Sequence, residues 1–274
     1  MIKFNNQQFK NCIQKCLQVF NEEYFFRPVI GLELEFYVSN KKNIALLEKD
    51  LSNKKIHYTL TKETGDNQYE VQLTPSMQIF KTLSDLAKIK RSILKIPSST
   101  LAAKPFIDQP GSALHLHLNF VDRERKNLFD KLSNEEETSL LLNCIAGLLD
   151  TLPEAMYFFA PTEKDYARYQ ASIDTPSNIS WGNNNRTVSI RIPGQDSGSR
   201  RIEHRVASAA TNQFAVCAVI FAGCLYGIQN ALQPAKKIYG NAYLPQYKLE
   251  SLPSSLGISY SHLISKKILL SFMN

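Results

Sequence analysis

Apolar residues along this chain follow two spacings, one typical of helices and one typical of strands. Within 6–20 they recur every three or four positions, which predicts an amphipathic helix. Within 29–38 and 113–120 every second residue is apolar. Both segments are therefore predicted to be strands with one apolar and one polar face.

Further segments complete an α+β pattern. We expect helices at 43–52, 78–95, 134–152 and 211–231, and strands near 56–61, 68–73, 186–192 and 201–206. The segment 160–185 is polar and irregular, as functional loops often are. Strands grouped with long helices, without regular βαβ alternation, indicate a mainly antiparallel sheet. No segment has the composition of an internal linker, so residues 1–274 are expected to form one domain.

The most apolar segment, 214–228, is shorter than the roughly 20 residues that a membrane-spanning helix needs. Its Gly223 and Gly227 suit close helix packing, so we expect a buried helix and no membrane partner. The N-terminus lacks an apolar signal core, which makes the cytoplasm the expected compartment.

The net charge of +7 favours anionic partners as a class. The positive residues are scattered, so the charge gives no specific support for nucleic-acid binding, and we expect none. Five cysteines without a CxxC pair indicate neither a disulfide framework nor a zinc knuckle. The sequence also contains no P-loop, no GxGxxG motif and no GxSxG motif.

The polar faces of four predicted strands carry the residue types of a phosphoryl-transfer site. The sets that share a face are Glu33 with Glu35; His115 with His117 and Asn119; Thr187 with Ser189 and Arg191; and Arg201 with Glu203 and Arg205. Any one set is explained by a sheet that shows polar residues to water. If the faces line one cavity, they supply ligands for magnesium or manganese beside guanidinium groups that bind phosphate.

Two more carboxylates, Glu63 and Glu70, flank the turn-forming residues of the segment ETGDNQYE (63–70). Two acids beside one turn can fold onto one cation. Taken alone, however, this pattern marks a surface hairpin more often than a site.

Five segments of the chain resemble the catalytic domain of the glutamine synthetases, a family that includes the γ-glutamyl-amide ligases. They are GLELEF (31–36), ETGDNQYE (63–70), GSALHLHLNF (111–120), ISWGNNNRTVSIRIP (179–193) and RRIEHRVASAATNQFA (200–215). They occur in the family's order, and a weaker match, LPSSLG (252–257), follows. The resemblance implies a curved, mainly antiparallel half-barrel flanked by helices.

The resemblance also implies a role for each matching position. Glu35, Glu63 and Glu70 match the ligands of a first divalent metal, and Glu33, His115 and Glu203 match those of a second. His117, Asn119, Arg186, Arg191 and Arg201 match contacts to ATP. Gly111, Arg168 and Arg205 match contacts to the amino-acid substrate. Arg186, Asp174 and Arg205 match positions with catalytic roles.

The implied chemistry has two steps and uses ATP with two or three Mg²⁺ or Mn²⁺ ions. ATP phosphorylates the side-chain carboxylate of glutamate or a related acid. Ammonia or another amine then displaces the phosphate, which gives glutamine or another γ-glutamyl amide.

The chain also departs from the family pattern. Asp174 stands where the family's mobile flap has a glutamate, and Pro110 replaces an asparagine of the glutamate-binding loop. No segment matches the β-grasp domain that precedes GLELEF in full-length members, so we expect that domain to be absent. The family's twelve-subunit ring is then not expected, while a smaller homo-oligomer stays open.

These departures leave an alternative function open. It is a catalytically impaired relative that binds nucleotide or partners a full-length synthetase. A glutamate–cysteine ligase would suit the GLELEF strand alone, but the segments around Arg186 to Arg205 argue against it.

Overall fold

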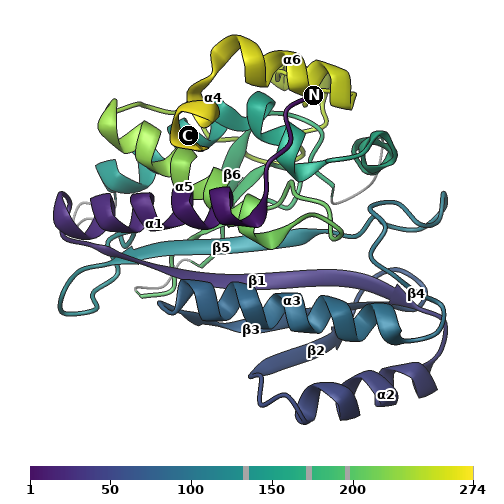
Figure 1. Ribbon diagram of the computed structural model, residues 1–274. Coiled ribbons are helices and arrows are strands. Elements are labelled where there is room, and N and C mark those ends of the chain that lie inside the picture. Colours follow the sequence, from purple (N-terminus) through teal and green to yellow (C-terminus); the bar gives the residue numbers. More distant parts are fainter. Residues whose placement is uncertain (132–135, 171–174, 195–197, 274) are drawn as a thin grey trace.

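One eight-stranded sheet forms the centre of this computed structural model, which describes residues 1–131, 136–170, 175–194 and 198–273 (Figure 1). The strands are β1 (Arg27–Val38), β2 (Tyr58–Lys62), β3 (Gln68–Ser76), β4 (Ser99–Thr100), β5 (Leu114–Val121), β6 (Trp181–Asn183), β7 (Ile190–Ile192) and β8 (Ile202–His204). Their order is β2-β3-β1-β5-β8-β7-β6, and β4 pairs with the end of β1. Only β6 and β7 pair in parallel among these strands, which confirms the predicted α+β class with a mainly antiparallel sheet.

Helices cover the apolar side of the sheet in two layers. The α-helices are α1 (Asn6–Glu22), α2 (Lys41–Ser52), α3 (Ile79–Lys95), α4 (Ser139–Phe159), α5 (Gln213–Gln229), α6 (Leu256–Lys266) and α7 (Ile268–Met273). Helices α1, α2, α3 and α5 contact the strands, whereas α4 packs on α5 and α6 packs on α4. Short 3₁₀ helices span Glu163–Tyr169 and Pro245–Tyr247.

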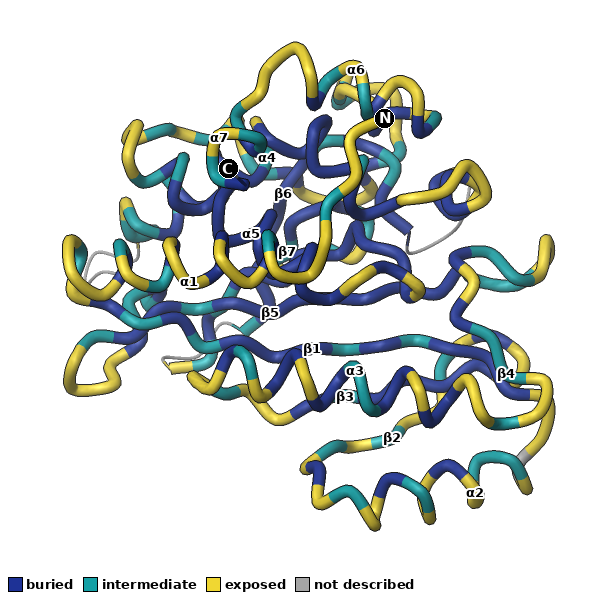
Figure 2. The backbone as a smooth tube through the Cα atoms, viewed as in Figure 1, coloured by how far each residue is buried: buried dark blue, intermediate teal, exposed yellow. Residues whose placement is uncertain are grey.

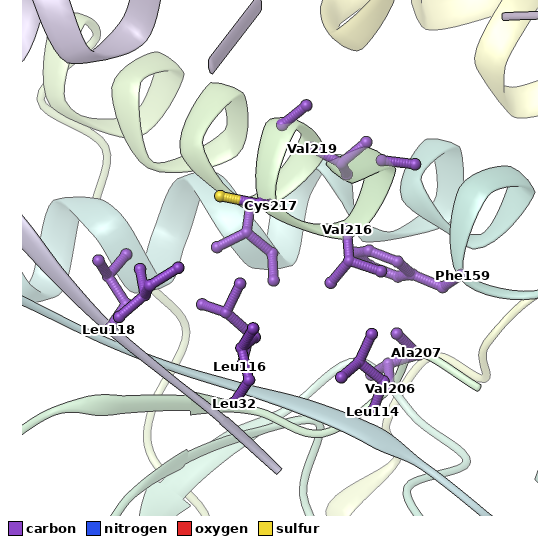
Figure 3. Packing of buried hydrophobic residues seen from close by; sticks show 14 of the residues in the cluster. Leu32, Leu114, Leu116, Leu118, Phe159, Val206, Ala207, Val216, Cys217 and Val219 are labelled. Carbon is purple, nitrogen blue, oxygen red and sulfur yellow. The ribbon is translucent and has the colours of Figure 1, made fainter. Parts of the chain in front are cut away.

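The alternating residues of β1 and β5 build the core. Figure 3 shows Leu32, Leu116 and Leu118 pointing from these strands toward Val216 and Cys217 of α5. In Figure 2 the central strands and α5 are buried along most of their length, while the outer side of α1 is exposed. The polar residues that alternate with this apolar set therefore point to the opposite side of the sheet.

Helices α4 and α5 cross at unusually close range because glycines face each other. A Cβ atom added to Gly147 would lie 2.1 Å from the carbonyl oxygen of Gly223. One added to Gly227 would lie 2.0 Å from the carbonyl oxygen of Asn143. This packing explains the apolar segment 214–228 as a buried helix.

Across the described parts of the chain, none of the helices combines the length and the apolar character needed to span a membrane.

Two predicted elements differ most in their bounds from those observed. Helix α4 begins at Ser139, not at 134, and its N-cap is Thr138, whose hydroxyl accepts a hydrogen bond from the Leu141 amide. The predicted first residue, 134, lies outside the described residues. The predicted strand 186–192 is reduced to Ile190–Ile192, because Asn185 bonds the amide and the hydroxyl of Thr187 and bends the chain there.

Candidate active site

The pairing of the strands places the acidic and basic residues in adjacent positions on the polar side of the sheet. Glu33 of β1 lies opposite His115 of β5, and Glu35 lies opposite Glu70 of β3. Glu203 of β8 lies between His117 of β5 and Arg191 of β7 in register. The strand pairing thus gathers residues that are up to about 170 positions apart in sequence.

Two groups of side chains are close enough to share a cation. The donor atoms of Glu33, His115 and Glu203 all lie within 4.8 Å of one another, and so do those of Glu35, Glu70 and His115. Within the first group, His115 Nδ1 lies 3.4 Å from Glu33 Oε2 and 4.0 Å from Glu203 Oε1. Carboxylates with one imidazole are a donor set that suits Mg²⁺ or Mn²⁺.

The first group is the set expected for the second metal. The set expected for the first metal is brought together only in part, because Glu35 and Glu70 meet His115 while Glu63 belongs to neither group. Glu63 lines the same cavity, and its role as a ligand stays a prediction.

The electrostatics of the carboxylates also fit a cation. Burial and the charge of Glu33 raise the pKa of Glu70 to about 7, and burial and the charge of Glu35 raise the pKa of Glu63. Both shifts mean that the ionised carboxylates are disfavoured where they stand. A dication bound among them would favour the charged forms.

Glu33 and Glu203 are stabilised as anions by their neighbours. Burial alone would raise the pKa of Glu33, but hydrogen bonds with His115 and His117 hold it below its usual value. Burial likewise opposes charge on Glu203, but Arg205 and His115 lower its pKa to about 2. Burial alone would lower the pKa of His115, and the hydrogen bond to Glu33 raises it instead.

Glu203 is the residue that joins the acidic and the basic side of the site. It is 1% exposed, and its two oxygens each accept a hydrogen bond at 2.6 Å, one from Arg191 and one from Arg205. Arg201 donates to His117 Nδ1 at 2.9 Å, which leaves His117 Nε2 facing Glu33 Oε1, also at 2.9 Å. Guanidinium groups and carboxylates are therefore interleaved in the site.

Two adjoining cavities hold the expected site residues. The central cavity, of about 390 Å³, is lined by all six expected metal ligands together with Gly111, Arg168, Arg186, Arg191 and Arg205. The outer cavity, of about 410 Å³, is lined by His117, Asn119 and Arg201. Glu33 and Gln72 line both cavities, so the two spaces meet at the middle of the sheet.

Arg168 and Arg186 differ in their surroundings from the other expected residues. Arg168 is 2% exposed and donates to the carbonyl oxygens of Val206 and Arg205, so part of its guanidinium holds the backbone. Arg186 is exposed at the rim of the central cavity. Asp174 lies outside the described residues, and its neighbour Thr175 lines the central cavity.

Two glutamines that line the cavities were not predicted from the sequence. Gln68 and Gln72 of β3 lie on the same side of the strand as Glu70, because residues two apart point the same way. The alternation that selected Glu33 and Glu35 would have found them if it had been applied to β3.

Comparison with known proteins gives one family. Residues 55–274 match the model of the glutamine synthetase catalytic domain. The chain is 33% identical over 184 residues to the gamma-glutamylputrescine synthetase of Escherichia coli (strain K12), and 32% identical over 302 residues to type-1 glutamine synthetase 2 of Dictyostelium discoideum. These alignments cover 65% and 94% of this chain, but only 39% and 56% of the relatives.

A third relative and a solved structure agree with this assignment. The chain is 32% identical over 187 residues to a glutamate–isopropylamine ligase of Pseudomonas sp, which covers 66% of this chain and 40% of that relative. The structure of GmaS in complex with ADP superposes with a TM-score of 0.84 at 21% identity, over 96% of this chain and 69% of that one. The structural likeness supports the fold. The family model and the sequence identities show that this chain belongs to the glutamine synthetase family.

Proposed function

We propose that the protein is an ATP-dependent ligase that joins the side-chain carboxylate of glutamate to an amine. The observation that carries the proposal is the position of Glu203. Its carboxylate faces the candidate cation ligands Glu33 and His115 on one side and contacts Arg191 and Arg205 on the other. Cation ligands beside guanidinium groups are what a site for transferring a phosphoryl group needs.

Each cavity has a separate role in this proposal. The outer cavity, with His117, Asn119 and Arg201, takes the nucleotide, and the central cavity takes glutamate and the amine. Glu33, His115 and Glu203 would hold one divalent cation, and Glu35, Glu63 and Glu70 another. When bound, such cations neutralise charge on phosphate oxygens.

The protein's own residues then guide two bond exchanges. Arg186 and Arg191 bind oxygens of the transferred phosphoryl group, while Arg205 and the backbone of Gly111 hold the amino acid. A side-chain oxygen of glutamate attacks the terminal phosphorus of ATP, and the bond to ADP breaks. The amine nitrogen next attacks the carbonyl carbon, phosphate leaves, and Asp174 accepts the proton that the amine loses.

The names of the relatives suggest which class of amine is the acceptor. Their names include ligases for putrescine and for isopropylamine beside glutamine synthetases, so primary alkylamines and ammonia are the candidates. We assign residues 1–274 to a single catalytic domain and place the reaction in the cytoplasm, where ATP is supplied.

The test is phosphate release from ATP with Mg²⁺ or Mn²⁺, L-glutamate and a panel of ammonia, alkylamines and diamines. Glu203→Gln is the inactive variant, because the neutral amide loses the charge that Arg191 and Arg205 contact. Glu124→Gln is the matched control at an exposed position away from both cavities.

Amine-dependent release in the wild type and in Glu124→Gln, with loss in Glu203→Gln, would support the ligase and name its acceptor. Magnesium-dependent binding of ATP without release for any amine would contradict it. That result would favour the nucleotide-binding or partner role instead, which co-purification with a longer homologue would then support.

A further inference from the structure

Gln68 connects two loops that border the central cavity. It is 2% exposed and begins β3, between the expected metal ligands Glu63 and Glu70. Its side-chain oxygen accepts a hydrogen bond from the Gly65 amide at 3.1 Å, and its side-chain nitrogen donates to the Gly111 carbonyl at 3.0 Å. Both ends of the amide are therefore used, each on a different loop.

The backbone of Gln68 fixes Glu63 as well. The Glu63 amide donates to the Gln68 carbonyl at 2.9 Å, and the Gln68 amide donates to the Gly65 carbonyl at 3.1 Å. These bonds close the turn 63–68 on itself. A change in the side chain of Gln68 would thus reach Glu63 through the turn, and Gly111 directly.

The second loop, 109–111, is held at several points. Gln109 accepts a hydrogen bond from the Asp66 amide at 2.9 Å, and the Tyr37 hydroxyl donates to the Pro110 carbonyl at 2.8 Å. Gly111 itself sits in a tight space, since an added Cβ would lie 2.7 Å from both Ala103 O and Arg168 Cγ. The position therefore excludes a side chain, and Gln68 holds the carbonyl oxygen of Gly111.

We propose that Gln68 is a positioning residue that couples the turn carrying Glu63 to the backbone of Gly111, so that cation binding and amino-acid binding assist each other. The inference rests on the proposed function, which places the cation at Glu63 and glutamate at Gly111. The chemistry selects glutamine, because the position needs an acceptor for one amide and a donor for one carbonyl. A carboxylate there would face the Gly111 carbonyl without a proton to donate.

The test compares Gln68→Met, which keeps the length of the side chain and removes both hydrogen bonds, with the wild type. Loss of two buried hydrogen bonds is expected to raise the KM for glutamate by about tenfold or more, and to leave the KM for ATP within about twofold. Gln68→Glu should raise the KM for glutamate further. Gln78→Met, at an exposed position, is the matched control and should leave both constants unchanged.

A readout of the coupling separates positioning from a general loss of structure. Calorimetry gives the Kd of glutamate at low and at saturating Mg²⁺. In the wild type saturating Mg²⁺ should tighten glutamate binding, and in Gln68→Met the ratio of the two Kd values should approach one. Tyr37→Phe removes the hydrogen bond to the Pro110 carbonyl. It should also weaken glutamate binding, but by a smaller factor than Gln68→Met.

Equal Mg²⁺ dependence in the wild type, Gln68→Met and Tyr37→Phe, each with an unchanged Tm, would overturn the inference. So would parallel changes in the KM for ATP and for glutamate. Failure of the proposed function would show in another experiment, because the wild type would then release no phosphate in response to any amine. The binding measurement needs no turnover, so it reports on Gln68 separately from the phosphate-release assay.

Discussion

Lys90 of α3 is a charged residue held in an apolar setting. It is 8% exposed, and its Nζ donates to the carbonyl oxygen of Thr211 at 2.5 Å. Burial lowers its pKa from 10.5 to about 7. The unfolded chain therefore binds more protons than the folded chain between pH 7 and 10.5, so this residue makes stability rise with pH across that window.

We expect Lys90→Met to remove this dependence. The free energy of unfolding of the wild type, relative to the variant, should rise between pH 7 and pH 10, because Met has no proton to lose. Urea unfolding at several pH values measures the difference. Lys95→Met, at an exposed position of the same helix, is the matched control for replacing a lysine by methionine. Parallel curves for the wild type and Lys90→Met would contradict the assignment.

Glu70 and Glu203 lie in one cavity but should respond in opposite ways to neutralisation. The pKa of Glu70 is raised to about 7, so its negative charge destabilises the cation-free fold. This destabilisation begins above the ordinary pKa of 4.5 and reaches its full size above pH 7. Glu203 has its pKa lowered to about 2, so its charge stabilises the fold throughout the neutral range.

In cation-free buffer at pH 8, Glu70→Gln is expected to raise the Tm, and Glu203→Gln is expected to lower it. Removing one partner from a buried ion pair costs about 3 kcal/mol, which sets the scale for Glu203→Gln. The gain from Glu70→Gln should fade as the pH falls toward 4.5. Thermal unfolding with a chelator present measures both, and a loss of stability in each variant would contradict this account of the cavity.

Alternation along single strands was enough to place most of the candidate site. Glu33, Glu35 and His115 share a face because residues two apart in a strand must do so, whatever the rest of the chain does. The role of Arg168 in holding the Val206 carbonyl, and that of Gln68 in joining two loops, depend on contacts between distant segments. No local pattern specifies such contacts, so the sequence could not predict them.

At the scale of the elements, the close crossing of α4 and α5 restricts which residues can replace the glycines between the two helices. Gly147 faces the backbone of Gly223 and of Gly227, where an added Cβ would lie between 2.1 and 2.7 Å from backbone atoms. Backbone atoms cannot move aside as a flexible side chain can, so the two helices would have to separate.

Gly147→Ala is therefore expected to destabilise the protein by about 1–3 kcal/mol, even though alanine favours helices. Gly257→Ala in α6 is the matched control, since the nearest atom to its added Cβ is 4.0 Å away. Alanine there should be neutral or stabilise by up to about 1 kcal/mol. Urea unfolding measures both changes, and equal effects of the two substitutions would show that the crossing tolerates a methyl group.

Elements were predicted more reliably than their ends. The helix at 134–152 exists, but it starts at Ser139 and continues through Pro153 to Phe159. Pro153 has no backbone N–H to donate to the helix, yet the packing of α4 between α5 and α6 outweighs the loss of that hydrogen bond. The start was misplaced because three glutamates at 135–137 look like a first helical turn. Glu137 instead pairs with Arg200, a contact across the fold.

At the scale of the whole molecule, the sheet separates the hydrophobic core from the polar cavities. One hydrophobic core fills the side that α1, α3 and α5 cover, and the two cavities lie on the side of the polar residues. Substitutions on the polar side can thus change binding while the packing of the apolar side chains stays the same, and their effect on stability comes from charge. The net charge of +7 carried little information, because the charges that matter are the interleaved carboxylates and guanidinium groups of one cavity.

The measurement that tests the central claim most directly follows oxygen from glutamate into phosphate. The enzyme is supplied with ATP, Mg²⁺, the accepted amine and glutamate labelled with heavy oxygen in its side-chain carboxylate. If the carboxylate attacks ATP and the amine then displaces the phosphate, mass spectrometry will find one labelled oxygen in each phosphate released. Phosphate without the label would show that water attacks ATP, and it would contradict the assignment of the cavity to amide-bond formation.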